Sequence, residues 1–383
     1  MSARADFLYL SEGDTVAAGV LDTARCVDVC EDVFRLLHAG DYLMGGAHGN
    51  SHGMGLPFPK SSPFPNMPVA GPDRRFVTMP AYLGGRFDVC GNKWYGSNPD
   101  NPKSGLPRSV LTLMLNDKDT GEPIALMSAN QISAARTGAV PAVATRHLAT
   151  KEATVLAVLG AGAINRACVK AIVGERRELT SVAVFDLFPE VAQAFADWCS
   201  DELGLTGVAA SSAQEAVSEA DIVTVAASRL QPLTVEAKWF KDGATVLLSG
   251  PLLGDDEFWL NSEIVYDHIG LHEAYVEEAV ASGDRAKYYA GVIGGPLYTL
   301  IDQGRLSPLQ DSVSLGAVIN GDAAARDNST LNVFVACGMA VFDVAWGLDL
   351  YHTAIDKGLG QSLDLWGAGP SRPTSLAPAS LQP

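Results

Sequence analysis

One stretch decides the fold: Val155-Leu156-Ala157-Val158-Leu159-Gly160-Ala161-Gly162-Ala163-Ile164-Asn165. Its first five residues form an uninterrupted apolar run, which is typical of a buried strand in a parallel sheet. Gly160 permits a tight turn, and Gly162 lets the backbone approach a phosphate without a Cβ in the way. A helix opening at Ala163 points its unpaired N–H groups and the positive end of its dipole at that anion. The stretch predicts a dinucleotide-binding turn.

An acidic residue follows at a suitable distance. Asp186 closes the next apolar segment and lies 24 residues after Gly162 (186 − 162), close to the ~20 typical of a carboxylate that binds the adenosine ribose. A carboxylate there repels a 2′-phosphate, so the pattern favours NAD(H) as cofactor. Asn165 stands in the place of the third glycine and weakens the match. The alternative is a glycine turn beside a surface acid.

Strands and helices alternate on both sides of this turn. We expect strands over 155–159, 181–185, 208–210, 222–226 and 245–248, and helices over 164–173, 190–203 and 213–219. This alternation predicts an α/β fold with a Rossmann-type, doubly wound parallel sheet.

The residues before this sheet predict a second, mixed α/β unit. Helical spacing marks 22–39 and 131–148, and strand-like segments cover 75–82, 86–94, 110–116 and 124–127. The segment 45–73, rich in Gly, Pro, Ser and His, predicts a loop or lid. For a chain of 383 residues we expect two domains: a substrate-binding and dimerisation domain over 1–150, completed by a C-terminal helix in 331–366, and an NAD-binding domain over 151–330. The tail 367–383 is expected to be disordered.

Composition narrows the possible partners. The net charge is −17, which disfavours nucleic acid and anionic membrane surfaces. No apolar run approaches the ~20 residues of a membrane helix, and no apolar segment follows the N-terminus, so we expect a cytoplasmic protein. The six cysteines show neither CxxC pairs nor zinc-like spacing, which predicts free thiols and no metal site.

Two basic residues lie among apolar or small neighbours. Lys93 interrupts a strand-like segment, and a buried lysine needs a partner or a role, unless it lies on the solvent face of that strand. Arg136 is surrounded by small residues, which permit close approach of a ligand, and a guanidinium can bind a carboxylate through two parallel hydrogen bonds.

These residues belong to a wider pattern, which comprises Lys93, Gly105-Leu106-Pro107, Asp117-x-x-Thr120-Gly121-x-Pro123-x-Ala125-Leu126-Met127, Ser133-Ala134-x-Arg136-Thr137-Gly138-Ala139 and the nucleotide turn. From about Met79 to Gly360 the chain resembles the ornithine cyclodeaminase/mu-crystallin family. Members of that family include amino-acid dehydrogenases, ketimine reductases, cyclodeaminases and synthases of diamino acids, all of which use NAD(H) or NADP(H).

The resemblance implies roles for particular residues. Lys93 and Arg136 would bind the substrate's α-carboxylate beside the nicotinamide, and Lys93 would also carry a proton. Asn165 falls where the family often has glutamine. A further carboxylate-binding arginine is expected upstream of Lys93, with Arg75 and Lys60 as candidates. The expected cofactor contacts are Ser109, Gly160, Ala161, Gly162, Ala163, Ile164, Asn165, Asp186, Ser228, Ser249 and Gly250. Family members pair through the N-terminal domain, which predicts a homodimer.

Three departures from the family pattern bear on the reaction. Pro251 stands where cyclodeaminases carry an aspartate, and Asp255 or Asp256 could compensate only in a rearranged loop. Ala336, followed by Cys337, replaces a serine expected near the nicotinamide. The loop 45–73 is longer than usual.

The histidines and Cys337 allow several interpretations. His48 and His52 could bind a metal, contact substrate from a lid or be exposed to solvent, whereas His268 and His272 are expected to be loop histidines. Cys337 is expected to be a small apolar wall residue, because hydride transfer to an imine needs no covalent intermediate.

The sequence therefore predicts an NAD(H)-dependent oxidoreductase that reduces a small imino acid, or oxidises the amino acid. One alternative is an ornithine- or lysine-type cyclodeaminase, against which Pro251 argues. A second is a non-catalytic NAD(P)H-binding protein of crystallin type.

Overall fold

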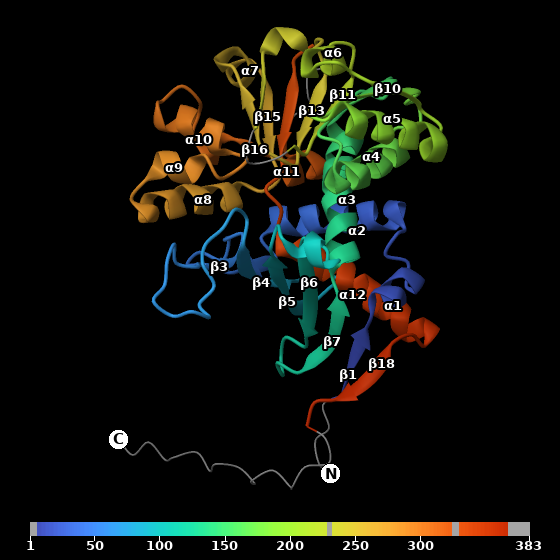
Figure 1. The fold of residues 1–383 in the computed structure, drawn as a ribbon, viewed down its shortest axis with the longest axis vertical. Helices are drawn as coiled ribbons and strands as arrows, with labels where there is room; N and C mark the ends of the chain where they lie inside the picture. Colours follow the sequence, from blue (N-terminus) through green and yellow to red (C-terminus); the bar gives the residue numbers. More distant parts are fainter. Residues whose placement is uncertain (1–5, 228–231, 324–328, 367–383) are drawn as a thin grey trace.

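A computed structural model describes residues 6–227, 232–323 and 329–366. It contains two eight-stranded sheets, one above the other in Figure 1, and a two-stranded sheet of β12 (Leu233–Val235) and β14 (Leu252–Gly254). Ser228 and the tail 367–383 lie outside the described residues, so the predictions made for them stay predictions.

The lower sheet is mainly antiparallel. Its order is β18 (Gln361–Asp364), β1 (Asp6–Leu10), β7 (Pro123–Ser128), β6 (Ser109–Asn116), β5 (Val89–Ser97), β4 (Arg75–Leu83) and β2 (Tyr42–Met44), with β3 (Met54–Leu56) also pairing with β4. Helix α12 (Ala340–Lys357) packs against β4, β5 and β6, and α2 (Thr23–Ala39) packs against α12. The short helix α1 (Glu12–Ala17) follows β1.

The upper sheet is parallel throughout, in the order β10 (Thr206–Ala209), β9 (Ser181–Phe185), β8 (Val155–Leu159), β11 (Ile222–Val225), β13 (Thr245–Leu248), β17 (Asn332–Val335), β15 (Glu263–Tyr266) and β16 (Val313–Ser314). Its helices are α4 (Ala163–Glu175), α5 (Pro189–Leu203), α6 (Ala213–Val217), α7 (Asp256–Leu260), α8 (Ile269–Ser282), α9 (Arg285–Tyr289), α10 (Gly295–Asp302) and α11 (Leu315–Asn320). The strand order reverses between β8 and β11, where doubly wound sheets bind ligands. The predicted Rossmann-type fold is confirmed.

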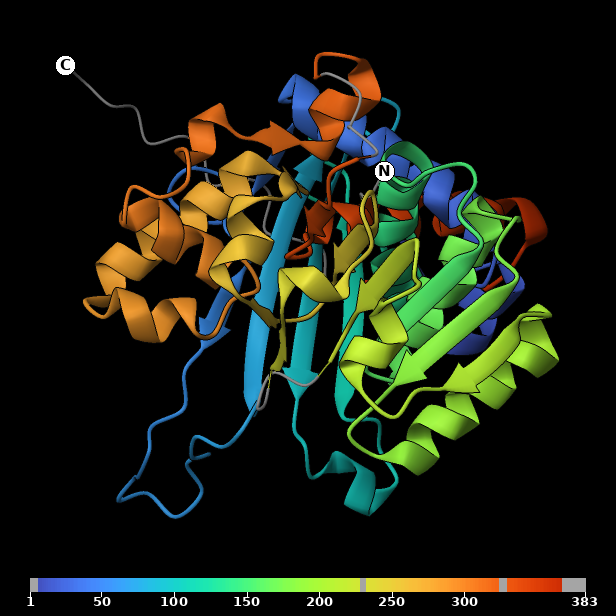
Figure 2. The same cartoon turned by 90° about the horizontal axis from the view of Figure 1, so that it is seen from above.

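Two helices join the sheets. Helix α3 (Asn130–Leu148), teal in Figure 1, starts beside β6 and packs along α4. The contact is close because a Cβ at Gly138 would lie 2.6 Å from the Ala167 carbonyl carbon. Helix α12 leaves the upper sheet directly after β17 and crosses the lower one. Figure 2 shows the same arrangement from above.

Two segments differ from expectation. The chain stays in the upper sheet through β17, so the C-terminal return to the lower sheet begins after Val335 and not at 331. Asn332–Val335 is a run of only four residues, so its sequence alone does not distinguish this strand from the apolar helix that follows it. Within 45–73, the segment Met54–Leu56 pairs with β4, which anchors part of the expected lid to the sheet. No helix in the described part of the chain is long and apolar enough to cross a membrane.

Candidate active site

The glycine turn lies at the carboxyl end of β8. Gly160 has φ +92°, and a Cβ there would come within 2.8 Å of Ala227 Cα, so both conformation and packing require glycine. A Cβ at Gly162 would meet nothing within 4 Å, and α4 begins immediately afterwards without a side-chain cap. The first amides of α4 therefore have room for an anion in front of them.

Asn165 supports this turn from behind. Its side chain is fully buried: Nδ2 donates to the carbonyls of Leu159 (2.9 Å) and Gly160 (2.6 Å), and Oδ1 accepts from Thr224 Oγ1 (2.9 Å). The side chain that breaks the glycine fingerprint thus ties the turn to β11. We expect it to shape the cofactor site and not to contact the nucleotide.

Asp186 lies at the mouth of the turn. Its Oδ2 accepts from the Ala161 amide at 2.8 Å, and its Oδ1 accepts from the Phe188 amide at 3.1 Å. On the other side of β8, Ser249 and Gly250 follow β13, and a Cβ at Gly250 would lie 3.0 Å from Ala226 Cα. The glycine turn, Asp186 and Ser249-Gly250 thus all lie at the carboxyl edge of the parallel sheet.

Lys93 and Arg136 meet at a third residue, Asp343, in the first turn of α12. Asp343 Oδ2 lies 2.8 Å from Lys93 Nζ and 3.1 Å from Arg136 Nε, and the latter contact is an ion pair without hydrogen-bond alignment. The side chains of Lys93 and Asp343 are 3% and 0% exposed. Lys93 therefore faces the interior, and the solvent-face alternative does not hold.

Close packing of α12 on the sheet creates this contact. On β5 the side chain of Lys93 points to the buried face of the sheet, and that of the next residue, Trp94, points to the exposed face. Two residues earlier, a Cβ at Gly91 would come within 2.7 Å of Val344 Cγ2. The glycine therefore lets α12 approach closely enough for Asp343 to reach Lys93.

Two buried cations share one carboxylate, which leaves a net positive charge. Burial and, to a smaller extent, the Arg136 charge lower the pKa of Lys93, whereas Asp343 raises it, and the net result is a pKa of about 8. Burial would raise the pKa of Asp343, but the Arg136 and Lys93 charges outweigh it and hold this pKa below its ordinary value. Asp343 Oδ1 has no hydrogen-bond partner among the described residues. Within the same residues, the Arg136 terminal nitrogens hydrogen-bond only Ser133 Oγ, at 3.5 Å. The cluster can therefore accept an anionic ligand.

The cluster is adjacent to the nucleotide turn. Arg136 lies two residues before Gly138, which touches Ala167 of α4. Cys168 Sγ lies 4.0 Å from both the Thr137 carbonyl and Ser249 Oγ. Contacts through α4 therefore join the Lys93–Asp343–Arg136 cluster to both halves of the cofactor edge.

His52 approaches the same cluster from the loop between β2 and β3. Its Nδ1 lies 2.7 Å from the Gly338 carbonyl oxygen, and its ring stacks on Tyr275 with centroids 6.2 Å apart. A Cβ at Gly338 would lie 3.2 Å from Arg136 Nη1. A Cβ at Gly53 would lie 2.8 Å from Met79 Cγ, and Met79 pairs with Lys93 across the sheet. His52 therefore lies beside the cluster, because it contacts Gly338 and is followed in the chain by Gly53.

Other predicted residues lie elsewhere. Arg75 forms an ion pair with Asp73 and stacks on Tyr95. It lies four residues before Met79 on β4, and Met79 is the residue that pairs with Lys93, so Arg75 is about 13 Å from that pair at the residue spacing of a strand. Lys60 is exposed in the loop. Neither is seen beside Lys93, and the position of the second carboxylate-binding residue stays a prediction. Ser109 bonds Tyr95 Oη at the start of β6, and its cofactor contact stays a prediction.

The remaining candidates have structural partners. Asp255 caps α7 by accepting from the Phe258 and Ala237 amides, and Asp256 pairs with Arg305 on the surface, so neither replaces the missing aspartate at Pro251. His48 is mostly exposed near Glu277. The expectation of loop positions is wrong for His272, which is fully buried in α8 because an aspartate and a tyrosine satisfy its ring nitrogens. The described residues contain no side-chain cluster that could hold a metal.

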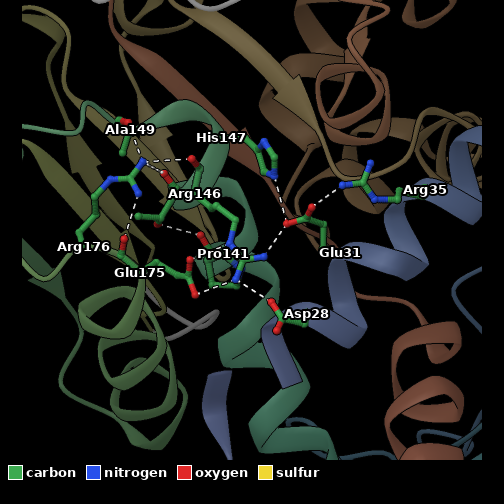
Figure 3. A network of polar contacts seen from close by, with 10 residues as sticks. Asp28, Glu31, Arg35, Pro141, Arg146, His147, Ala149, Glu175 and Arg176 are labelled. Atoms are coloured by element: carbon green, nitrogen blue, oxygen red, sulfur yellow. Dashed lines mark hydrogen bonds and ion pairs between the residues drawn. The ribbon is translucent and has the colours of Figure 1, made fainter. Parts of the chain in front are cut away.

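A network at the far end of α3 connects the sheets. Arg146 makes paired contacts with Glu175 of α4 at 2.7 and 3.0 Å and also reaches Glu31 of α2 at 2.6 Å (Figure 3). Arg176 donates to the carbonyls of Thr145, Arg146 and Ala149, which satisfies the carboxyl end of α3. The helix that carries Arg136 is therefore anchored at its far end to both halves of the molecule.

The chain matches known proteins in sequence and in fold. The model of the ornithine cyclodeaminase/mu-crystallin family matches residues 20–358. N-((2S)-2-amino-2-carboxyethyl)-L-glutamate dehydrogenase of Staphylococcus aureus is 27% identical, over 94% of this chain and 99% of the relative. A delta(1)-pyrroline-2-carboxylate reductase of Bacillus thuringiensis is 28% identical, over 78% and 87%. The solved dimer of an archaeal alanine dehydrogenase with bound NAD is 25% identical, with a TM-score of 0.74 over 94% of this chain and 99% of that one.

Proposed function

Since the chain belongs to the ornithine cyclodeaminase/mu-crystallin family, we propose that Lys93, Asp343 and Arg136 form the site at which it reduces a small imino acid to an amino acid, or catalyses the reverse oxidation. The chain is a nicotinamide-dependent oxidoreductase of imino and amino acids, the activity that its relatives share. The observation that carries the assignment of the site is a buried cluster with net positive charge beside the nucleotide turn.

The cofactor is NAD(H), and the residues present fit it. The open space at Gly162 and the uncapped start of α4 suit a pyrophosphate, and Asp186 at the mouth of the turn suits ribose hydroxyls. When bound, the nicotinamide supplies or accepts a hydride.

The three cluster residues have separate tasks. The terminal nitrogens of Arg136 bind the substrate's α-carboxylate, and the Lys93 ammonium adds a second contact to it. Asp343 holds both cations in place and offsets part of their charge, so that one added carboxylate leaves the site neutral. Lys93 Nζ also gives a proton to the substrate nitrogen or removes one from it, because a pKa of about 8 lets both of its forms exist near neutrality.

The cyclodeaminase alternative lacks an acidic side chain. Pro251 can neither pair with a substrate amine nor accept a proton, and Asp255 is occupied as a helix cap. A purely binding role of crystallin type does not require a lysine whose pKa is lowered to about 8 beside the carboxylate-binding arginine.

A substrate panel tests the reaction. Oxidation of NADH is followed at 340 nm with 2-oxo acids plus ammonia or methylamine and with preformed cyclic imines such as delta(1)-pyrroline-2-carboxylate. At least one imino acid should be reduced stoichiometrically. If NADH binds but no imino or amino acid in the panel is turned over in either direction, the reductase proposal is abandoned in favour of the binding role.

We also propose a homodimer that pairs through the outer face of the lower sheet. Phe76 and Trp94 stack there with ring centroids 5.6 Å apart, and Trp94 and Val110 are 43% and 48% exposed. They border a mostly apolar hollow of about 340 Å³ that also includes Phe58 and Pro68. A second copy that covers this face removes its apolar surface from water. Exposed apolar patches of this kind mark interfaces between proteins.

A further inference from the structure

A second buried carboxylate, Asp267, binds the turn that contains Gly338, next to the Arg136 guanidinium. Asp267 directly follows β15 and is 1% exposed. Its Oδ2 accepts from the amides of Cys337, at 2.7 Å, and Gly338, at 3.3 Å. These two residues lie between β17 and α12, so one side chain fixes the turn through which the chain passes from the upper to the lower sheet.

Asp267 is itself held from behind. Its Oδ1 accepts from the His268 amide at 2.8 Å and contacts His272 Nε2 at 2.8 Å. His272 Nδ1 lies 2.6 Å from Tyr298 Oη, and His272 and Tyr298 are both fully buried. Because an ionised carboxylate can only accept, His272 carries a proton on Nε2, and a neutral ring in this tautomer accepts the Tyr298 hydroxyl proton at Nδ1. Every hydrogen bond in the series then has one donor and one acceptor.

The turn held by Asp267 touches Arg136. Gly338 has φ +81°, and a Cβ there would come within 3.2 Å of Arg136 Nη1. The Gly338 carbonyl is the group that His52 contacts. The position of this one peptide therefore limits where the terminal nitrogens of Arg136 can lie.

We propose that Asp267 is a positioning residue and that the series Asp267–His272–Tyr298 sets the Cys337–Gly338 turn against Arg136, and thereby the direction in which the guanidinium presents its terminal nitrogens. This role rests on the proposed carboxylate-binding function of Arg136. In this role none of the three residues contacts the substrate, and each acts only through Arg136. Their removal therefore weakens binding of the substrate's carboxylate and leaves cofactor binding intact.

Tyr298→Phe is the mildest test, because it removes a single hydroxyl. The neighbouring Tyr289→Phe is the matched control: Tyr289 is also buried, its ring packs on Tyr298 at 5.3 Å, and its hydroxyl bonds Asp302, outside the series. We expect Tyr298→Phe to raise KM for the imino acid about 3- to 10-fold, the equivalent of one net hydrogen bond. The values of kcat and of Kd for NADH should stay within about twofold, and Tyr289→Phe should change none of them.

Two further variants extend the test. Gly338→Ala crowds Arg136 directly and should raise KM by about tenfold or more without affecting Kd for NADH. Asp267→Asn should raise KM more than Tyr298→Phe does; if it does not fold, Tyr298→Phe and Gly338→Ala decide the question. Equal effects of the two tyrosine variants on KM, or a loss of thermal stability with KM unchanged in Tyr298→Phe and Gly338→Ala, would overturn the proposal.

A binding measurement separates this role from the reaction itself. Pyrrole-2-carboxylate, a planar and unreactive carboxylate, is titrated into the NADH-bound protein by calorimetry. If the protein turns over no substrate, the reductase proposal fails, while at least threefold weaker binding in Tyr298→Phe, absent in Tyr289→Phe, still supports the positioning role. Unchanged affinity in Tyr298→Phe and Gly338→Ala contradicts it.

Discussion

Lys93 and Arg136 could be singled out from the sequence because charged side chains stand there among apolar and small residues. Asp343 was missed, although it interrupts the apolar run from Ala340 to Gly347 in the same way. A carboxylate in such a helix signals a buried partner. Which cation it meets depends on the packing of α12 across β5, which no local pattern reveals. The sequence left several roles open for His52, and only the fold shows that it lies beside the cluster, next to Gly53 in the chain and in contact with Gly338.

The lowered pKa of Lys93 gives the activity a defined pH dependence. Below about pH 8 the side chain is an ammonium, and above it a neutral amine. In the reductive direction, where Lys93 donates the proton, kcat/KM should fall as pH rises through about 8. In the oxidative direction it should rise over the same range. Asp343→Asn removes the anion that favours the ammonium and should shift both profiles to lower pH; profiles that stay in place would show that another group titrates.

Asp186 should determine the choice of cofactor. Its carboxylate, fixed by the amides of Ala161 and Phe188, favours ribose hydroxyls and repels a 2′-phosphate. The wild-type protein should prefer NADH to NADPH by tenfold or more in kcat/KM, and Asp186→Ser should narrow this ratio. A wild-type preference for NADPH, or an unchanged ratio in the variant, contradicts the assignment.

At the scale of elements, the alternation of strands and helices from β8 to β13 was predicted with ends within a few residues of those observed, because buried parallel strands are continuous apolar runs. The short strands β1, β2, β3, β14, β16, β17 and β18 were not predicted, nor was β12, which lies between β11 and β13. Each has five residues or fewer and forms only by pairing with segments far away in the chain. Strands this short contain too few residues for the alternation of buried and exposed side chains to be recognised in the sequence.

The anchor of α3 in Figure 3 should make stability depend on pH. Hydrogen bonds from His147 and Arg146 outweigh burial and lower the pKa of Glu31 from 4.5 to about 2, with Arg35, Asp28 and Glu175 as the other charges around it. A lowered carboxyl pKa contributes stability that is complete above about pH 4.5 and is lost as pH falls towards 2.

Glu31→Gln should therefore reduce the free energy of unfolding at pH 7 by an amount on the order of 3 kcal/mol, measured by urea denaturation. The difference from wild type should shrink between pH 4.5 and 2.5. Glu202→Gln, at an exposed position in α5 away from the anchor, is the control and should show little change at pH 7. A difference for Glu31→Gln that is constant with pH would show that its charge has no special role in the anchor.

At the scale of the whole molecule, the outer face of the lower sheet predicts self-association. A dimer of about twice 40.3 kDa should be found by light scattering at micromolar concentration. Trp94→Glu places a charge in the middle of the apolar face and should yield monomers, whereas Lys170→Glu, at an exposed position of α4 on the upper sheet, should not. A wild-type monomer would refute the proposed interface.

The reaction proposed for the whole molecule requires that the substrate's carboxylate binds at the Lys93–Asp343–Arg136 cluster. The most direct measurement compares steady-state kinetics and NADH affinity of wild type, Arg136→Ala and Arg136→Lys on the best imino acid of the panel. Charge-assisted hydrogen bonds are each worth about 1.5–3 kcal/mol, so Arg136→Ala should raise KM about 10- to 100-fold. Arg136→Lys should recover part of that loss because an ammonium cannot make both parallel bonds, and Kd for NADH should stay within about twofold in all three proteins. Near-normal KM and turnover in Arg136→Ala, with NADH still bound, would contradict the assignment of the active site.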